Sequence, residues 1–508
     1  MKFERSSGIL LHPTSLPGPY GIGDIGPAAF TWIDFLARAG CGLWQVLPLG
    51  PTGYGDSPYQ SFSAFAGNPY LISIDSLIAE SLLTQQDLGE KPDFPHDHVD
   101  YGAIIPWKLE VLKRAHRQFV AGAKPSQQKA FDEFKNDNAV WLDDYALFMA
   151  LKEAHQSSAW WHWEKGFRQR EPAALEKARL QMKAAVERQA YFQYIFFKQW
   201  QSLKEYAGAH HIRIIGDIPI FVAHDSAEVW ANPDMFYLDQ KGQPTVQAGV
   251  PPDYFSPTGQ LWGNPLYRWK EHKKTGYAWW IQRFRSVLSQ VDIVRLDHFR
   301  GFAGYWEVPG KETTAMNGRW VPGPGKDFLR AVQAALGDLP IIAEDLGVIT
   351  PDVIDLRLSF HLPGMKILVF AFDEGPSDKD LPHQHSADCV VYTGTHDNDT
   401  VWGWYQRIEE NERDFMRRYL RTDAHDLAWD MIRTAWASAA VFSLAPMQDI
   451  LNLDNRARMN YPSRPEGNWQ WRMPGNALHE IVAIRIAELN WLYGRDHSPQ
   501  TMEQKKIV

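Results

Sequence analysis

The sequence predicts an α/β fold, a parallel (β/α)8 TIM barrel with large insertions on its C-terminal face and no separate C-terminal β domain. Two observations support this fold class. Eight short apolar runs rich in β-branched residues recur along the 508 residues, and segments with apolar residues at helical spacing separate them. The runs lie at 8–16, 42–50, 212–222, 291–299, 339–347, 365–373, 389–398 and 442–451. A doubly wound sheet is the alternative, but no glycine-rich phosphate-binding turn follows the first run.

Helices are expected between these strands. The first, 27–40, begins with Pro27 and ends at Gly40, which are the residues preferred at those two positions. Further segments with three-to-four-residue apolar spacing lie at 275–290, 325–338, 351–361, 424–440 and 475–494. We expect the last of these helices to close the barrel.

Two connections are too long for simple crossovers. The first, about 51–211, follows the second strand and is mainly helical, with one or two long helices over 172–210. The second, about 223–290, follows the third strand and is rich in proline, glycine and aromatic residues at its start, which suggests a substrate loop. Both follow the C-terminal end of a strand, so both should rise on the face where barrels build their sites. We therefore predict a single catalytic barrel over 1–508 with two insertions.

Composition narrows the classes of partner. Lys and Arg total 52, Asp and Glu total 61, the formal charge is −9 and no long basic run occurs, which argues against nucleic acid or an anionic membrane surface as a partner. The two cysteines, Cys41 and Cys389, lie in apolar strands and are predicted to be reduced and buried. No stretch resembles a signal peptide or approaches the roughly 20 apolar residues of a membrane span, so we expect a cytoplasmic protein.

Acidic residues stand at the ends of the predicted strands. They are Asp217, Asp297, Glu344, Asp345, Asp373, Asp397 and Asp449. In a parallel barrel these positions border one mouth. Capping of the following helix explains any single one of them equally well. Convergence of five or more favours a functional site.

Paired carboxylates at a barrel mouth suggest glycoside chemistry, in which one attacks the anomeric carbon and the other protonates the leaving oxygen. Arg295 and Asp297 are two residues apart and share one face of a strand, so Arg295 should keep Asp297 ionised by lowering its pKa. His298 and His396 raise the question of a metal, but zinc-type spacings such as H-E-x-x-H are absent, and no catalytic metal is predicted. A serine hydrolase is disfavoured because no G-x-S-x-G turn occurs.

Four short motifs resemble those of the α-amylase clan, and their form is similar to the 4-α-glucanotransferases of glycoside hydrolase family 77, the amylomaltase or disproportionating enzyme family. They are "GDIPIFV" (216–222), "RLDHFRG" (295–301), "AEDLG" (343–347) and "THDN" (395–398). The resemblance continues through 11–26, 54–72, 249–267, 446–451 and 458–472, and therefore covers nearly the whole chain. The last segment departs from the family's pattern in its "SRPEG" stretch.

The resemblance implies a division of labour among three carboxylates. Asp297 matches the nucleophile that forms a covalent β-glycosyl intermediate, Glu344 matches the general acid/base, and Asp397 matches the carboxylate that holds the 2- and 3-hydroxyls of the sugar. Residue spacing alone does not say which carboxylate attacks. Retention requires two carboxyls about 5 to 5.5 Å apart, a separation that neighbouring strand ends allow, and an acid/base with a raised pKa.

The resemblance also implies substrate contacts. Arg295 matches the arginine beneath the nucleophile, His396 a hydroxyl-binding histidine, and Asp217 the acidic residue of the first motif.

Further candidates for sugar contacts come from residue type. Tyr54, Tyr59 and Trp262 are predicted to stack on glucose rings, with ordinary packing as the alternative. Asp253 and Asp373 are predicted to bind hydroxyls near the cleaved bond, with helix capping as the alternative.

The resemblance thus implies a retaining transferase that acts on maltooligosaccharides, amylose or starch, uses a glucan or glucose as acceptor, and needs no cofactor. Water must then lose to a sugar hydroxyl, and the proline- and aromatic-rich run 249–267 is predicted to build a wall over the acceptor side. A retaining α-amylase-type hydrolase is the first alternative, disfavoured by this run and by the missing C-terminal β-rich region. A non-catalytic starch-binding protein is the second, disfavoured because all three carboxylates are present.

Overall fold

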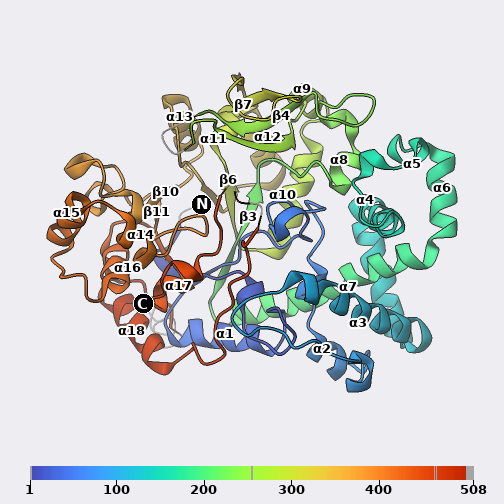
Figure 1. Cartoon of the computed structure of the whole chain (residues 1–508), viewed down its shortest axis with the longest axis horizontal. Coiled ribbons are helices and arrows are strands. Elements are labelled where there is room, and N and C mark those ends of the chain that lie inside the picture. The colour runs from blue at the N-terminus through green and yellow to red at the C-terminus, as the bar shows by residue number, and fades with distance from the viewer. Residues whose placement is uncertain (1–2, 253–255, 463, 465, 499–508) are drawn as a thin grey trace.

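The computed structural model describes residues 3–252, 256–462, 464 and 466–498. Eight parallel strands form its central sheet in the order β10-β11-β12-β1-β2-β3-β6-β9 (Figure 1). Their bounds are β1 Ser6–Leu10, β2 Leu43–Gln45, β3 Arg213–Pro219, β6 Ile293–Asp297, β9 Ile341–Ala343, β10 Gly364–Ile367, β11 Cys389–Tyr392 and β12 Phe442–Pro446. Each strand overlaps one of the eight predicted runs, so the barrel fold is confirmed.

The barrel closes between β9 and β10 through two hydrogen bonds. The amide of Ala343 donates to the carbonyl of Pro363 at 2.9 Å. The amide of Met365 donates to the Asp345 carboxylate at 2.7 Å, so a side chain replaces a backbone partner at this seam. Arg357 pairs with the same carboxylate at 3.1 Å. Asp345 therefore helps to close the barrel, since it satisfies the Met365 amide that an open sheet edge would expose.

Helices surround the sheet and pack on one another (Figure 1). They are α1 Pro27–Arg38, α10 Ala278–Gln290, α12 Gly325–Leu336, α13 Pro351–Ser359, α14 Val401–Arg407, α15 Glu410–Leu420, α16 Leu427–Ala437, α17 Met447–Ile450 and α18 Glu480–Leu492. The helices predicted at 27–40, 275–290, 325–338, 351–361, 424–440 and 475–494 all occur. Cys41 and Cys389 are both buried and free, as predicted.

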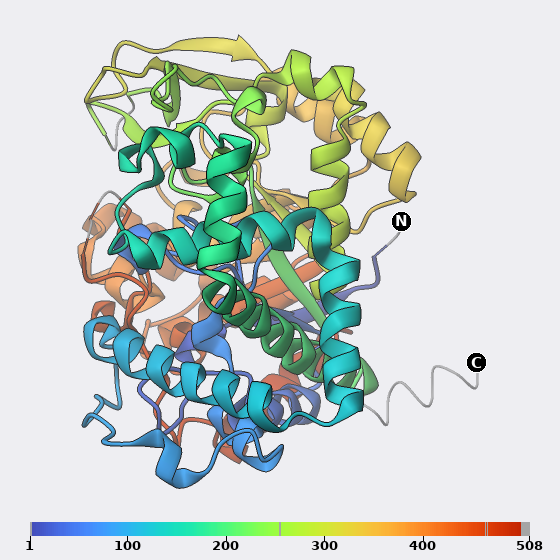
Figure 2. The ribbon, with the colours of Figure 1, turned by 90° about the vertical axis from the view of Figure 1, so that its right-hand side faces the viewer.

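The long segment after β2 is helical. It contains α2 Ile74–Ala79, α3 Tyr101–Gly122, α4 Pro125–Ala154, α5 Lys165–Arg168, α6 Pro172–Gln181 and α7 Lys183–Ala209. Both α3 and α4 pack on α7, which also contacts α1 and α10 and leads into β3. Figure 2 looks onto these helices. The long helices predicted over 172–210 are therefore α6 and α7.

A second sheet of four antiparallel strands stands above the barrel at the top of Figure 1, in the order β5-β4-β7-β8. Its strands are β4 Val246–Val250, β5 Gln260–Pro265, β7 Gly304–Pro309 and β8 Arg319–Pro322, and the short helices beside it are α8 Ala227–Ala231, α9 Trp269–Lys274 and α11 Arg300–Ala303. The β7–β8 hairpin, which follows the fourth barrel strand, was not predicted from the sequence. This hairpin adds a third long connection on the C-terminal face.

Within the described part of the chain, no helix combines the length and the apolar character that crossing a membrane requires.

Candidate functional site

A buried arginine joins two acidic strand ends. In the parallel register of β3 and β6, Asp217 lies beside Arg295 and Pro219 beside Asp297. Arg295 forms ion pairs with Asp217 and, at 3.0 Å between Nη1 and Oδ1, with Asp297. The hydroxyl of Tyr59 donates to Asp217 at 2.7 Å. The face shared by Arg295 and Asp297 is therefore a charged network inside the barrel mouth.

Glu344 follows β9 directly, next to Asp297 on the neighbouring strand. Its carboxylate is buried and accepts two backbone hydrogen bonds, from the amide of His298 at 2.6 Å and from the amide of Leu346 at 2.8 Å. The strands thus hold both carboxyl groups from rigid elements.

Burial is the largest influence on the pKa values of Asp297 and Glu344. It raises the pKa of Glu344 to about 7, although its two amide donors and Arg295 favour the ion. It raises the pKa of Asp297 to about 6, more than Arg295 lowers it. Arg295 lowers the pKa of Asp297, as predicted, but desolvation raises it by more. The charge of Asp297 also raises the pKa of Glu344, so the two carboxyls release their protons as an interacting pair.

The third carboxylate stands on a turn after β11. The side chain of Asn398 accepts hydrogen bonds from the amide and the hydroxyl of Thr395, at 2.8 and 2.9 Å, and this turn presents His396 and Asp397. The amide group of Asn460 donates to Asp397 at 2.6 Å. The carboxylate is 47 % exposed, with His396 at 3.4 Å, and burial lowers the pKa of His396. Asp397 is thus anchored and open to a ligand.

Three rings pack together beside this turn. Tyr59 stacks on His396 with centroids 5.0 Å apart, and Trp469 contacts both rings at 5.8 and 5.5 Å. Tyr59 therefore has a packing role and, through its hydroxyl, holds Asp217 in place.

Trp262 and Tyr54 differ in their surroundings. Trp262 lies on β5, is half-buried, and meets the ring of His298 edge to face at 4.8 Å, so the second sheet reaches the end of β6. Tyr54 is 75 % exposed in the turn Tyr54–Asp56, and among the described residues it makes no hydrogen bond or ring contact.

Of the two predicted hydroxyl ligands, Asp373 is not part of this cluster. The prediction that Asp373 closes the sixth strand was wrong, because β10 ends at Ile367 and the chain continues as the 3-10 turn Leu368–Phe370. Asp373 is exposed and lies near Asp380, whose pKa it helps to raise. Asp253 lies outside the described residues. A role in binding stays a prediction for both.

The capping interpretation holds for Asp449. Its buried carboxylate accepts hydrogen bonds from the hydroxyl of Thr393 at 2.7 Å and from the amide of Val401, the first residue of α14, at 2.8 Å. Asp449, like Asp345, therefore supports the structure rather than the mouth.

Two residues hold the predicted carboxylates through contacts that the sequence did not indicate, although Asn460 was expected to help close the barrel mouth. The amide of His298 binds Glu344, and the side chain of Asn460 binds Asp397. His298 follows the strand's last carboxylate directly, which is the only signal for it. Asn460 lies in the 458–472 segment, which the resemblance covers less well. In the portion that the structure describes, no group of three or more His, Cys, Asp or Glu side chains is arranged to hold a metal ion.

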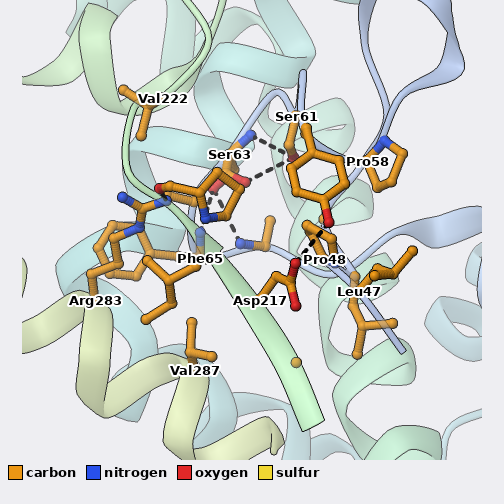
Figure 3. Close-up of a pocket in the computed structure, with 18 of the residues that line it drawn as sticks. Leu47, Pro48, Pro58, Ser61, Ser63, Phe65, Asp217, Val222, Arg283 and Val287 are labelled. Atoms are coloured by element: carbon orange, nitrogen blue, oxygen red, sulfur yellow. Dashed lines mark hydrogen bonds between the residues drawn. The ribbon is translucent and has the colours of Figure 1, made fainter. Parts of the chain in front are cut away.

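A mostly apolar cavity of about 60 Å³ lies behind Asp217, between β3, the 47–66 loop and α10 (Figure 3). Phe65, Val222 and Val287 line it together with Arg283. This volume holds a few water molecules but no chain of sugars.

Comparisons with known proteins agree on one family. The family described as 4-alpha-glucanotransferase matches residues 11–478. A 4-alpha-glucanotransferase of Thermus thermophilus is 52 % identical over 94 % of this chain and 97 % of its own length, and one of a Synechocystis species is 50 % identical over 97 % and 98 %. The solved structure of amylomaltase from Streptococcus agalactiae in complex with acarbose superposes with a TM-score of 0.94, at 39 % identity, and covers 97 % of this chain and all of that one.

Proposed function

Because the chain belongs to the 4-alpha-glucanotransferase family, we propose that it transfers α-1,4-glucan segments from a donor to an acceptor. The donor is a maltooligosaccharide, amylose or starch chain, and the acceptor is the 4-hydroxyl of a glucan or of glucose. One observation carries the proposal: two carboxyls stand at neighbouring strand ends, Asp297 paired with Arg295 and Glu344 buried, with its pKa raised by burial to about 7. A carboxylate paired with an arginine can act as nucleophile while a buried neighbouring carboxyl acts as acid.

In the first step, ionised Asp297 attacks the anomeric carbon of the donor. A bond forms between its carboxylate oxygen and that carbon, and the bond to the 4-oxygen of the next sugar breaks. Glu344 gives its proton to that leaving oxygen. Arg295, held by Asp217 behind the nucleophile, favours the ionised form of Asp297 and orients it.

In the second step, the 4-hydroxyl of the acceptor attacks the same carbon. Glu344 takes the hydroxyl proton, the new glycosidic bond forms, and the bond to Asp297 breaks. Each step inverts the anomeric carbon, so the product keeps the α configuration. Neither step uses a cofactor or a metal ion.

Asp397 and His396 are proposed to bind hydroxyls of the sugar under attack. Asp397 is fixed by Asn460 yet 47 % exposed, which suits a group that accepts hydrogen bonds from a ligand. Hydrogen bonds that strengthen as the ring flattens stabilise the transition state more than the ground state.

Transfer instead of hydrolysis requires that water be kept from the intermediate. The second sheet stands over the mouth, and Trp262 on β5 packs against His298, next to Asp297. We propose that two strands of this sheet, β4 and β5 with Trp262, form a wall over the acceptor side, here called the acceptor wall. An acceptor sugar that fills the space beneath it displaces water.

Pure maltotriose is the direct test. The proposal predicts glucose together with a ladder of longer maltooligosaccharides, whereas a hydrolase yields only shorter products and a binding protein yields none. Asp297→Asn should abolish the ladder, and Asp414→Asn, an exposed change on α15, should leave it intact. A folded Asp297→Asn protein with full activity contradicts the proposed nucleophile.

We further propose that the chain acts as one catalytic unit in the cytoplasm, with carbohydrate as its partner and neither nucleic acid nor membrane. The formal charge of −9 supports the exclusion of nucleic acid and anionic membranes, because negatively charged surfaces repel one another. Cell fractionation tests the location.

A further inference from the structure

The pairing between β6 and β9 changes at the site. The register runs in parallel up to Leu296 beside Ala343, and the amide of Glu344 donates to the carbonyl of Leu296 at 3.0 Å. In a parallel ladder, alternate residues of one strand make both bonds to the other. The ladder would continue with the amide of His298 bound to the carbonyl of Glu344 and the amide of Leu346 bound to the carbonyl of His298.

Neither of these bonds forms. The amide of Phe299 takes the carbonyl of Glu344 at 3.0 Å, and the amide of Gly301 takes the carbonyl of His298 at 2.9 Å. The two displaced amides, those of His298 and Leu346, both donate to the Glu344 carboxylate instead, at 2.6 and 2.8 Å. The interrupted ladder thus supplies the donors that hold the carboxylate.

The interruption occurs where the backbone of His298 turns left-handed, with φ of 51°. Few residues other than glycine adopt this region, and histidine, asparagine and aspartate tolerate it best. One residue in this conformation turns the chain and re-aims its amide, as a β-bulge does beside many active sites. The His298 ring meets Trp262 at 4.8 Å, and Gly301 leaves it room, since a Cβ there would lie 3.2 Å from the ring and 2.6 Å from Ile220.

We propose that His298 is a positioning residue for Glu344: its left-handed backbone diverts two ladder amides to the carboxylate, and its ring braces the acceptor wall through Trp262. This inference rests on the proposed function, because it assigns Glu344 the proton transfer. The consequences for Glu344 are how firmly its carboxylate is held and at which pH it releases its proton.

The charges around Glu344 decide the direction of the effect. Arg295 lowers its pKa, Asp297 raises it, and the amides of His298 and Leu346 lower it. Burial lowers the pKa of His298 itself to about 4, so the ring is neutral and does not compete for the proton. Loss of the His298 amide bond therefore raises the pKa of Glu344 while the other charges stay in place.

Four variants separate the backbone from the ring: His298→Asn, His298→Gly, His298→Ala and His298→Val. All four lack the ring, but asparagine and glycine accept a left-handed backbone, alanine less so, and valine least. The measurement is kcat/KM for maltotriose disproportionation against pH, with KM for glucose as acceptor recorded for each variant.

The basic limb of the profile reports the deprotonation of Glu344. We expect it at its original pH in the Asn and Gly variants, higher in the Ala variant, and about one unit higher in the Val variant, as for one lost hydrogen bond to a charged group. The KM for acceptor glucose should rise in all four variants, because the ring contact with Trp262 is lost in each.

An unmoved basic limb in an active Val variant, or equal shifts in the Asn and Val variants, overturns the backbone role. Unchanged acceptor KM in all four overturns the bracing role. If the Val variant does not fold, the Ala and Asn variants test the backbone role, because the basic limb must move further in the Ala variant than in the Asn variant. Failure of the proposed function is distinguishable, because it would appear as an unaltered maltotriose solution with the unsubstituted protein.

Discussion

Arg295→Met is the most informative single change in the charged network. Methionine has a similar length but no charge, and the site offers it a neighbour of its own kind in Met365, which Arg295 contacts at 3.4 Å. The substitution leaves Asp217 and Asp297 without their shared cation. The Asp297 carboxyl is then expected to hold its proton to a higher pH, because Arg295 no longer lowers its pKa.

The magnitude follows from the burial of the pair. Removing one partner of a buried ion pair costs about 3–5 kcal/mol, and one pKa unit corresponds to about 1.4 kcal/mol, which gives about 2 to 4 units. Because the Asp297 side chain is 26 % exposed, we expect the lower end of that range, about 2 units. The pKa of Asp297, about 6 with Arg295 present, should rise accordingly. Since the nucleophile must be ionised, the acid limb of kcat/KM moves upward by that amount. Activity at pH 6, where half of the Asp297 carboxyls of the unsubstituted protein are ionised, falls about 50-fold. Arg295 also lowers the pKa of Glu344, so the basic limb moves in the same direction.

The assay is the initial rate of maltotriose disproportionation between pH 5 and about 9, with thermal unfolding to show that the variant is folded. Arg418→Met is the matched control, because Arg418 and Asp414 form an exposed pair at 3.0 Å on α15. Such surface pairs contribute little, so the control should keep the original profile. A folded Arg295→Met protein whose acid limb stays in place would refute the reasoning.

Three further predictions follow from the same contacts. A folded-state pKa raised to about 6 destabilises the original protein as the pH rises from the usual aspartate pKa to above 6, and Asp297→Asn removes this loss. From pH 4 to 8 the variant should therefore gain about 2 kcal/mol of unfolding free energy relative to the original chain, a value reduced for the 26 % exposure of the side chain. Chemical denaturation that shows no such gain contradicts this. Asn460→Ala should lower kcat/KM for maltotriose about 10- to 100-fold by releasing Asp397, and a loss below about threefold would count against that role. Trp262→Ala should raise the ratio of hydrolysis to transfer, measured as new reducing ends per glucose released, and an unchanged ratio would exclude Trp262 from the acceptor wall.

Local patterns predicted the barrel and the charged face of β6. Apolar runs mark strands because barrel strands are covered on both sides, and Arg295 and Asp297 share a face because strand side chains alternate. The prediction that Arg295 meets Asp297 is confirmed by their ion pair.

Features that depend on distant residues were not predicted. The pKa of Asp297 is raised because the folded chain buries it, which a pair of neighbouring residues cannot reveal. Asp345 helps to close the barrel and Asp449 caps α14 through partners from other strands and loops. Strand β7 of the β7–β8 hairpin pairs with β4, more than 50 residues earlier in the chain, so no local sequence pattern predicts this sheet.

The left-handed turn at His298 also depends on residues that are distant in the sequence. Its cause is the competition between a continued ladder and the Glu344 carboxylate for two amides, and that competition exists only once β6 and β9 lie side by side.

The covalent intermediate on Asp297 is the central claim, and mass spectrometry of the trapped protein tests it most directly. An α-maltosyl fluoride whose terminal 4-hydroxyl is blocked can serve as donor but not as acceptor, so the intermediate should accumulate in the absence of glucose. We predict one added maltosyl group of that reagent, located by peptide mapping on Asp297 and removed when glucose is added. Fluoride release without an adduct, or an adduct on another residue, would contradict the account.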